Sequence, residues 1–152
     1  FGLQYFYGTN RYNLPEKLSG IYEHYIVKET NLVKGLNDYF LVPQSRYCSV
    51  IESEIMDRKD LILTSKSNES GPYIIESIDG SKVFLTGHAE YDLYTLDKEY
   101  KRDINKGLKI DPPCNYYKEN DPKKDPIYSW HATSTIIYHN WLYYYVYEEE
   151  VM

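Results

Sequence analysis

The stretch YIIESIDGSKVFLTGHAE, residues 73–90, carries the clearest structural signal of the chain. Two runs rich in β-branched and aromatic residues, 73–78 and 81–85, flank the pair Asp79-Gly80. An Asp-Gly pair between two such runs is typical of a type I′ β-hairpin turn. The stretch therefore predicts two paired strands, of which the second ends in the apolar run Val83-Phe84-Leu85 and is buried.

The tripeptide His88-Ala89-Glu90 follows the second predicted strand directly. Side chains two residues apart in an extended chain project to the same side, so the carboxylate can hold the imidazole in one tautomer and stabilise it once protonated. This is the arrangement of a base and its orienting group in a nucleophilic triad. Ligands of α/β sheets bind beyond the carboxyl ends of strands, which favours a functional site at this point. The alternative is a plain pair of polar residues at the end of a surface strand.

The group that should accompany such a base, an activated nucleophile, is not evident in the sequence. Of the two cysteines, Cys48 lies in a β-branched context and Cys114 follows two prolines. Neither opens a helix after a strand, where backbone N–H groups would activate a thiol. They form neither a disulfide framework nor a metal motif, and the other histidines show no ligand spacing with His88, so we expect no bound metal.

Composition narrows the class of protein. The chain has 152 residues, 42% of them hydrophobic, 19 tyrosines and a formal net charge of −6. It is long enough for one domain, or part of one, with a real core. No long basic patch supports nucleic-acid binding, the apolar runs are too short to span a membrane, and no cleavable signal peptide is visible. We expect a cytoplasmic protein.

The rest of the chain alternates predicted helices and strands, which indicates an α/β layer protein. Further strands are expected at 21–27, 39–42 (ended by Pro43) and 61–64, helical segments at 1–7 (ended by Gly8), 32–36, 93–107 and 134–148, and loops at 9–19 and 109–127. The last helix is apolar nearly all round, so we expect it to be buried. The first residues look like a helix already under way, so we expect the start of the chain to be a cut.

Three more residues become candidates for binding only in context. Lys17 could supply a fixed cation for an anionic oxygen from a predicted loop. Taken by itself, a lysine in a polar loop is more simply interpreted as solvated. Ser45 is typical of a turn cap, since no Gly-x-Ser-x-Gly motif surrounds it. Arg102 could bind a carboxylate, but the helical count places it opposite an apolar stripe and so predicts a solvent-facing side chain. That stripe consists of Leu93, Leu96, Tyr100 and Ile104.

Several segments, spread along nearly the whole chain, resemble one known family. They are Leu3…Tyr7-Gly8, Glu16-Lys17-Leu18-Ser19-Gly20…Glu23-His24, Pro43-Gln44-Ser45-Arg46-Tyr47, Thr86-Gly87-His88-Ala89-Glu90-Tyr91-Asp92, Arg102-Asp103…Gly107-Leu108, Asn115-Tyr116 and Asn140-Trp141-Leu142…Tyr144-Tyr145-Val146-Tyr147. In this order they resemble the homoserine O-acyltransferases of the MetA type, which are the homoserine O-succinyltransferases and their acetyl-transferring relatives.

The resemblance implies a class I glutamine-amidotransferase-like (flavodoxin-like) three-layer α/β fold. Residues 1–152 would be the C-terminal half of one such domain, beginning just after the nucleophile elbow. The implied reaction is acyl transfer from succinyl-CoA or acetyl-CoA to the hydroxyl of L-homoserine, in methionine biosynthesis. It would pass through an acyl-thioester on a cysteine upstream of Phe1, with acyl-CoA as co-substrate and no bound cofactor.

Carried onto this sequence, the resemblance makes His88 the general base and Glu90 its orienting group, and it places Lys17, Ser45 and Arg102 against the substrate. For Arg102 this contradicts the helical count, and we follow the resemblance. Two departures from the family pattern concern substrate handling: Gln44 stands where a histidine is usual, and the Trp-Arg-Ser-His stretch reads Trp130-His131-Ala132-Thr133.

Alone, the chain is expected to be inactive, and it would act as a homodimer or with a complementary N-terminal half. Two other functions stay open, a non-catalytic folded fragment and another thiol-dependent amidotransferase-like activity such as glutamine hydrolysis.

Overall fold

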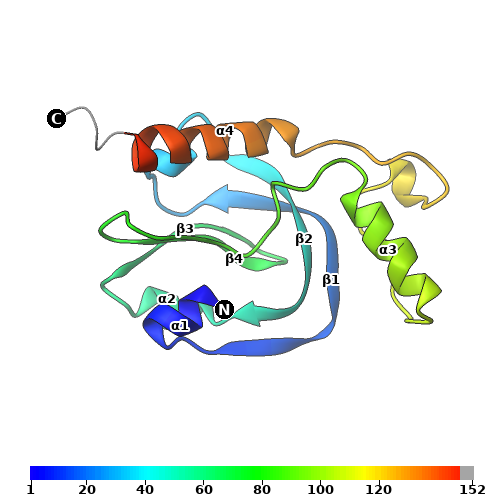
Figure 1. Cartoon of the computed structure of the whole chain (residues 1–152), viewed down its shortest axis with the longest axis horizontal. Helices are drawn as coiled ribbons and strands as arrows, with labels where there is room; N and C mark the ends of the chain where they lie inside the picture. Colours follow the sequence, from blue (N-terminus) through cyan, green and yellow to red (C-terminus); the bar gives the residue numbers. More distant parts are fainter. Residues whose placement is uncertain (148–152) are drawn as a thin grey trace.

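The strands form one curled antiparallel sheet in a computed structural model that describes residues 1–147. In this part of the chain the sheet has five strands in the order β2-β1-β3-β4-β5. They span Arg11–Ile26 (β1), Tyr39–Val50 (β2), Leu61–Ser67 (β3), Gly71–Ser77 (β4) and Val83–Leu85 (β5). β1 and β2 are long and curve over most of the height of the molecule (Figure 1).

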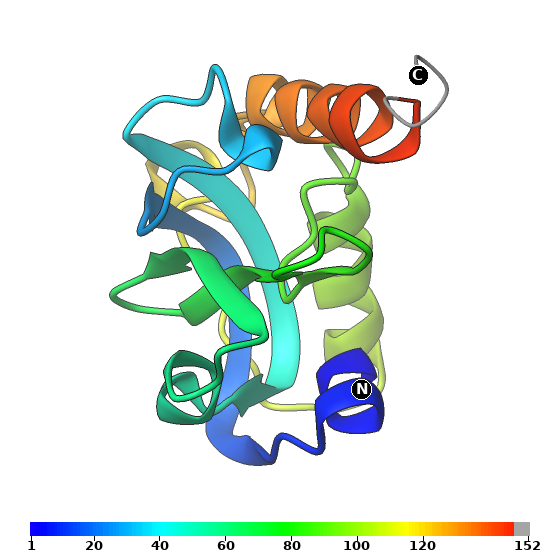
Figure 2. The same cartoon turned by 90° about the vertical axis from the view of Figure 1, so that its left-hand side faces the viewer.

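The helices lie around the sheet. They span Gly2–Tyr7 (α1), Glu52–Met56 (α2), Thr95–Asn105 (α3) and His131–Trp141 (α4), with short helical turns at Asn31–Val33 (η1), Lys118–Asn120 (η2) and Leu142–Val146 (η3). α4 crosses one end of the molecule and α1 and α2 lie at the other, whereas α3 stands to one side, as the two views in Figures 1 and 2 show. Within residues 1–147, no helix is both long and apolar enough to cross a lipid bilayer.

The two long strands correct two sequence predictions. Residues 9–19 were predicted as a loop, but β1 begins at Arg11 and pairs with β2 on both sides of an irregularity between Asn13 and Leu18. The predicted end of a strand at Pro43 is also wrong, because β2 continues to Val50. A proline is tolerated at this position because β2 is an edge strand and the Pro43 carbonyl faces away from β1, so the ladder needs no N–H there.

The hairpin predicted at residues 73–85 is confirmed, since β4 and β5 pair antiparallel. Its turn is not of type I′, however. Of the two central residues, only Gly80 has a positive φ (72°), whereas type I′ requires positive φ at both. The loop is longer than two residues: Ser77 N–H donates to Lys82 O over 2.9 Å, and Gly80 N–H donates to Ser77 O over 3.0 Å. The Asp79 carboxylate closes it by accepting hydrogen bonds from Ser77 and Ser81.

The terminal helix was predicted to be buried, and the described part of it is not. Only Thr133, Ile137 and Asn140 of α4 are buried, while Trp141 and Tyr143 are 42% and 57% exposed. α4 is held by Ile137, which packs into the hydrophobic core, and by the Asn140 amide, which donates to the carbonyls of Leu32 and Lys34 at the η1 turn over 3.0 and 2.7 Å. Residue 148, the predicted end of this helix, lies outside the described residues.

Candidate functional site

His88 and Glu90 lie in the segment that follows β5, and their side chains meet. His88 Nδ1 is 2.8 Å from Glu90 Oε1, as the two-residue spacing predicts. The backbone beneath them is fixed against β2: His88 N–H donates to Pro43 O over 2.9 Å. A Cβ atom on Gly87 would lie 2.6 Å from the Gln44 amide nitrogen, so only glycine allows this close approach. Both side chains remain open to solvent, at 33% and 49% exposure.

Tyr91 connects this pair to α3. Its ring stacks on the His88 imidazole, with 4.4 Å between centroids and 13° between planes. Its hydroxyl donates to Glu99 Oε1 over 2.8 Å, and its carbonyl accepts the Trp130 indole N–H over 2.9 Å. Burial, followed by the adjacent Glu99 carboxylate, raises the pKa of Tyr91. The hydroxyl therefore stays protonated and donates to Glu99 at neutral pH.

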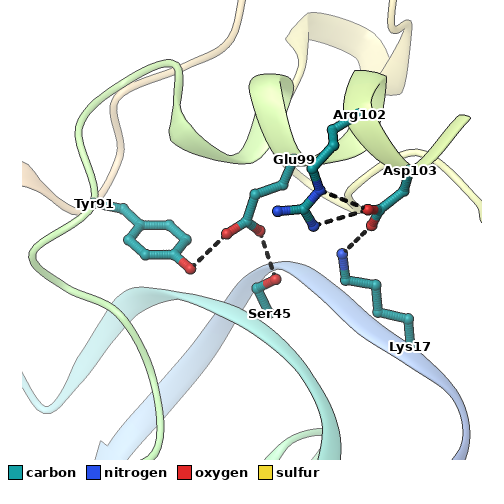
Figure 3. Close-up of polar contacts among 6 residues, drawn as sticks. All are labelled: Lys17, Ser45, Tyr91, Glu99, Arg102 and Asp103. Carbon is teal, nitrogen blue, oxygen red and sulfur yellow. Dashed lines mark hydrogen bonds and ion pairs between the residues drawn. The ribbon is translucent and has the colours of Figure 1, made fainter. Parts of the chain in front are cut away.

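Ser45 reaches the same carboxylate from β2. Its hydroxyl donates to Glu99 Oε2 over 2.6 Å, so Glu99 is held from both sides (Figure 3). Ser45 is neither a turn residue nor a backbone cap, because β2 runs straight through it. Glu99 was not among the residues identified from the sequence, yet it links Ser45 to the residue stacked on His88.

Lys17 and Arg102 meet at a second carboxylate, that of Asp103. Lys17 Nζ is 2.6 Å from Asp103 Oδ2, and Arg102 donates through Nε and Nη2 to Asp103 Oδ1 over 2.9 and 2.8 Å. The Lys17 side chain is only 7% exposed, which contradicts the solvated lysine of the simpler interpretation. The bond from Lys17 is the main reason that the pKa of Asp103 lies below its ordinary value.

The face of α3 that points to the sheet differs from the predicted one. Leu96 and Asp103 are buried on it, and Glu99 lies between them, at helical spacings of three and four. Ile104, predicted to be part of the apolar stripe, is 43% exposed. Arg102 flanks this polar face: its side chain is 54% exposed, but its guanidinium lies beside Lys17 and Ser45 rather than away from them (Figure 3). The feature of the sequence that could have indicated this polar face is the pair of acidic residues four positions apart, Glu99 and Asp103.

We refer to Lys17, Ser45, Glu99, Arg102 and Asp103 as the α3 cluster. A cavity of about 720 Å³ borders it at Lys17, with walls from β1, β2 and the loop after α3. The lining includes Tyr22, Tyr47, Ile110 and Cys114. The cluster therefore has open space beside it, of a size that fits a small-molecule ligand.

Neither cysteine lies at a helix start. Cys48 is a residue of β2 paired with Asn13, and Cys114 lies in a loop, where its N–H donates to Ser19 O over 3.1 Å. Both are free thiols. Neither position therefore has the backbone N–H groups of a helix N-terminus that would favour a thiolate.

Beneath the His88 segment, Gln44 is part of a buried polar network around His24. Both residues are fully buried. His24 Nδ1 donates to Tyr22 O over 2.9 Å, so Nε2 is the acceptor for the Gln44 amide at 3.1 Å and for the Ser70 hydroxyl at 3.2 Å. Burial, and to a lesser extent the nearby Arg46 guanidinium, lowers the pKa of His24 to about 4. His24 is a neutral structural residue and takes no part in the surface site.

Comparison with known proteins of similar structure identifies the fold. A glutamine amidotransferase from Methylobacillus flagellatus superposes with a TM-score of 0.60 at 10% identity, over 89% of this chain and 55% of that one. A glutamine amidotransferase from Thermotoga maritima gives a TM-score of 0.54 at 15% identity, over 88% of this chain and 50% of that one. The predicted glutamine-amidotransferase-like fold class is therefore confirmed.

Sequence comparison identifies the family. The family model described as homoserine O-succinyltransferase matches residues 1–152. The homoserine O-acetyltransferase of Lachnoclostridium phytofermentans is 46% identical over 97% of this chain, and that of Thermotoga neapolitana is 44% identical over 97%. The chain spans about half the length of these relatives, 49% in both cases. The family model and these relatives place the chain in the homoserine O-acyltransferase family of transferases, as a member that covers half the length of its curated relatives.

Proposed function

We propose that this chain is the C-terminal half of a cytoplasmic enzyme that transfers an acyl group from acyl-CoA to the hydroxyl of L-homoserine. The observation that carries the proposal is the junction of the His88–Glu90 pair with the α3 cluster through Tyr91, which stacks on His88 and bonds to Glu99. An acid–base group and a set of charged side chains thereby lie side by side. This combination fits a substrate that is both a zwitterion and an alcohol.

In this proposal His88 moves the proton of the homoserine hydroxyl. Glu90 holds Nδ1–H, which leaves Nε2 as the free basic nitrogen. The acyl group passes from the sulfur of acyl-CoA to a thiol supplied by the other half of the enzyme, and free CoA leaves. The homoserine oxygen then attacks the thioester carbon while Nε2 accepts its proton, and the proton returns to the departing thiolate. The products are O-acylhomoserine and the regenerated thiol.

The α3 cluster supplies both signs of charge that a free amino acid requires. Arg102 and Lys17 present N–H donors suited to the α-carboxylate. The Glu99 carboxylate can accept hydrogen bonds from the α-ammonium group. The hydroxyls of Ser45 and Tyr91, which donate to Glu99, hold the carboxylate in position for this contact. Two cations and two carboxylates make the cluster formally neutral, which matches a zwitterion better than it matches an anion.

The proposal is tested by joining residues 1–152 to the N-terminal part of the Thermotoga neapolitana relative that this chain does not cover. Release of free CoA is followed with acetyl-CoA or succinyl-CoA as donor and with homoserine or glutamine present. We expect CoA release only with homoserine, from one of the two donors. The two halves of the relative, joined in the same way, are the positive control, and the 152-residue chain alone should show neither turnover nor acylation by intact mass. Glutamine hydrolysis, or an inactive fusion beside an active control, would contradict the proposal.

Arg102→Ala in this fused protein should raise the homoserine KM by about tenfold or more and leave the acyl-CoA KM nearly unchanged, because the guanidinium is assigned to the homoserine carboxylate alone. The matched control is Lys101→Ala, which removes the neighbouring cation of α3, whose side chain is 66% exposed and pairs with Asp97 instead. Equal changes of both KM values in the Arg102 variant would remove Arg102 from the homoserine site.

A further inference from the structure

Each of the two carboxylate oxygens of Asp103 binds a different cation. Oδ2 binds Lys17 from the irregular part of β1, and Oδ1 binds Arg102 from α3. The carboxylate itself is buried, with 5% of its side chain exposed. Because the carboxylate is buried and both of its oxygens face these cations, its role in ligand binding would act through Lys17 and Arg102.

The two cations also depend on Asp103 for their positions. Lys17 has lost nearly all contact with water, at 7% exposure, and the Asp103 carboxylate is its one charged partner in the described part of the chain. Arg102 uses Nε and Nη2 for the same carboxylate, which fixes the plane of its guanidinium, and its Nη1 makes no hydrogen bond within residues 1–147. Without the carboxylate between them, two positive groups would face each other and separate.

We propose that Asp103 is a positioning residue that sets the spacing of Lys17 and Arg102 and so makes the site selective for amino alcohols that carry a free α-carboxylate. This proposal rests on the proposed function. Asp103 holds one cation from each of two elements at a fixed separation, and the free N–H groups of both cations then form one receptor for the carboxylate. The ammonium end of the ligand is served by Glu99, which Asp103 does not contact.

Two simpler roles give different expectations. If Asp103 acted only by its charge, removing that charge would strengthen the binding of an anionic carboxylate, because the site would become more positive. If Asp103 merely anchored α3 to β1, its loss would displace Glu99 as well, and ligands with and without a carboxylate would weaken alike. A positioning role predicts that only the ligand with a carboxylate is weakened.

The experiment measures binding to the 152-residue chain by NMR titration with two probes, L-homoserine and 3-aminopropan-1-ol, which is homoserine without its carboxylate. In Asp103→Asn the amide oxygen can still accept from Arg102, but its NH₂ group faces the Lys17 ammonium, donor against donor. We expect Asp103→Asn to weaken homoserine binding by about tenfold or more. Binding of 3-aminopropan-1-ol should change by less than about twofold.

Two further variants make the result interpretable. Asp97→Asn removes another acid of α3 that is engaged with Lys101 and Tyr117, and it should leave both probes unaffected. Asp103→Glu keeps the charge but displaces both cations, so it should lower homoserine binding severalfold and spare the other probe; it replaces Asp103→Asn if that variant does not fold. Tighter homoserine binding in Asp103→Asn, equal loss of both probes, or unchanged binding in Asp103→Glu would overturn the positioning role. A wild-type chain that binds neither probe would overturn the proposed homoserine site, and this inference with it.

Discussion

His88→Ala in the fused protein is expected to lower the rate of homoserine acylation by about 100-fold or more. A positioned general base contributes a factor of this size, and no other base lies within hydrogen-bond reach of Glu90 in the described structure. The loss should appear mainly in kcat, because His88 contacts no member of the α3 cluster directly and homoserine would still bind there. Steady-state kinetics with varied homoserine separates the two parameters.

The matched control for this variant is His139→Ala. His139 is an exposed histidine of α4 whose ring stacks on Tyr143, with 6.2 Å between centroids. Its replacement should leave turnover unchanged. If His88→Ala protein turned over homoserine at nearly the normal rate, His88 could not be the base, and the assignment of the site would fail.

The stability of the chain is expected to fall by about 2–3 kcal/mol between pH 7.5 and pH 4.5 because of His24 alone. Burial lowers the pKa of His24 from 6.5 to about 4 in the folded chain, so the unfolded chain binds a proton that the folded chain does not. The stability that neutral His24 contributes to the folded chain is fully present above pH 6.5, the pKa of this histidine in the unfolded chain. It is lost as the pH falls from 6.5 towards 4, where the unfolded state is increasingly favoured by protonation.

Urea unfolding at a series of pH values between 7.5 and 4.5 measures this loss. His24→Gln is the reference, because it removes the titrating group and leaves every other acid and histidine in place. Whatever its starting stability, the free energy of unfolding of the variant should fall less steeply with acidification, because its unfolding takes up as much as one proton fewer. Parallel curves for the two proteins would show that His24 does not remain neutral in the folded chain.

Local signals in the sequence predicted the features that depend on neighbouring residues. The hairpin of β4 and β5, the helix that Gly8 ends and the meeting of His88 with Glu90 all follow from spacings of a few residues, and all are present. The type of the hairpin turn was missed because Ser77 and Asp79 close a longer loop with their side chains. Side-chain hydrogen bonds of this kind compete with the backbone preferences on which turn predictions rest.

The features that were missed depend on residues far apart in the chain. Lys17 and Asp103 are separated by 86 positions, and Ser45 and Glu99 by 54. The extension of β1 over a polar, proline-containing segment likewise depends on pairing with β2, which local propensity does not encode. For Arg102 the helical count predicted an exposed side chain, and at 54% exposure it is one. The count could not show that the guanidinium pairs with Asp103, because periodicity assumes an apolar inward face and α3 buries the polar Asp103 beside Leu96.

Three consecutive residues of β2 set the relative positions of the two parts of the candidate site. The carbonyl of Pro43 fixes the backbone of His88, the side chain of Gln44 is locked into the core, and the hydroxyl of Ser45 holds Glu99. In the proposed function, the distance between His88 and the Glu99 carboxylate is therefore set by a single strand, through the main chain at Pro43 and the side chain of Ser45. Under the proposed function, replacing residues that line the cavity would leave this distance intact, whereas replacing Ser45 or changing the register of β2 against β1 would alter it. Engineering towards longer or shorter amino alcohols should therefore begin with β2.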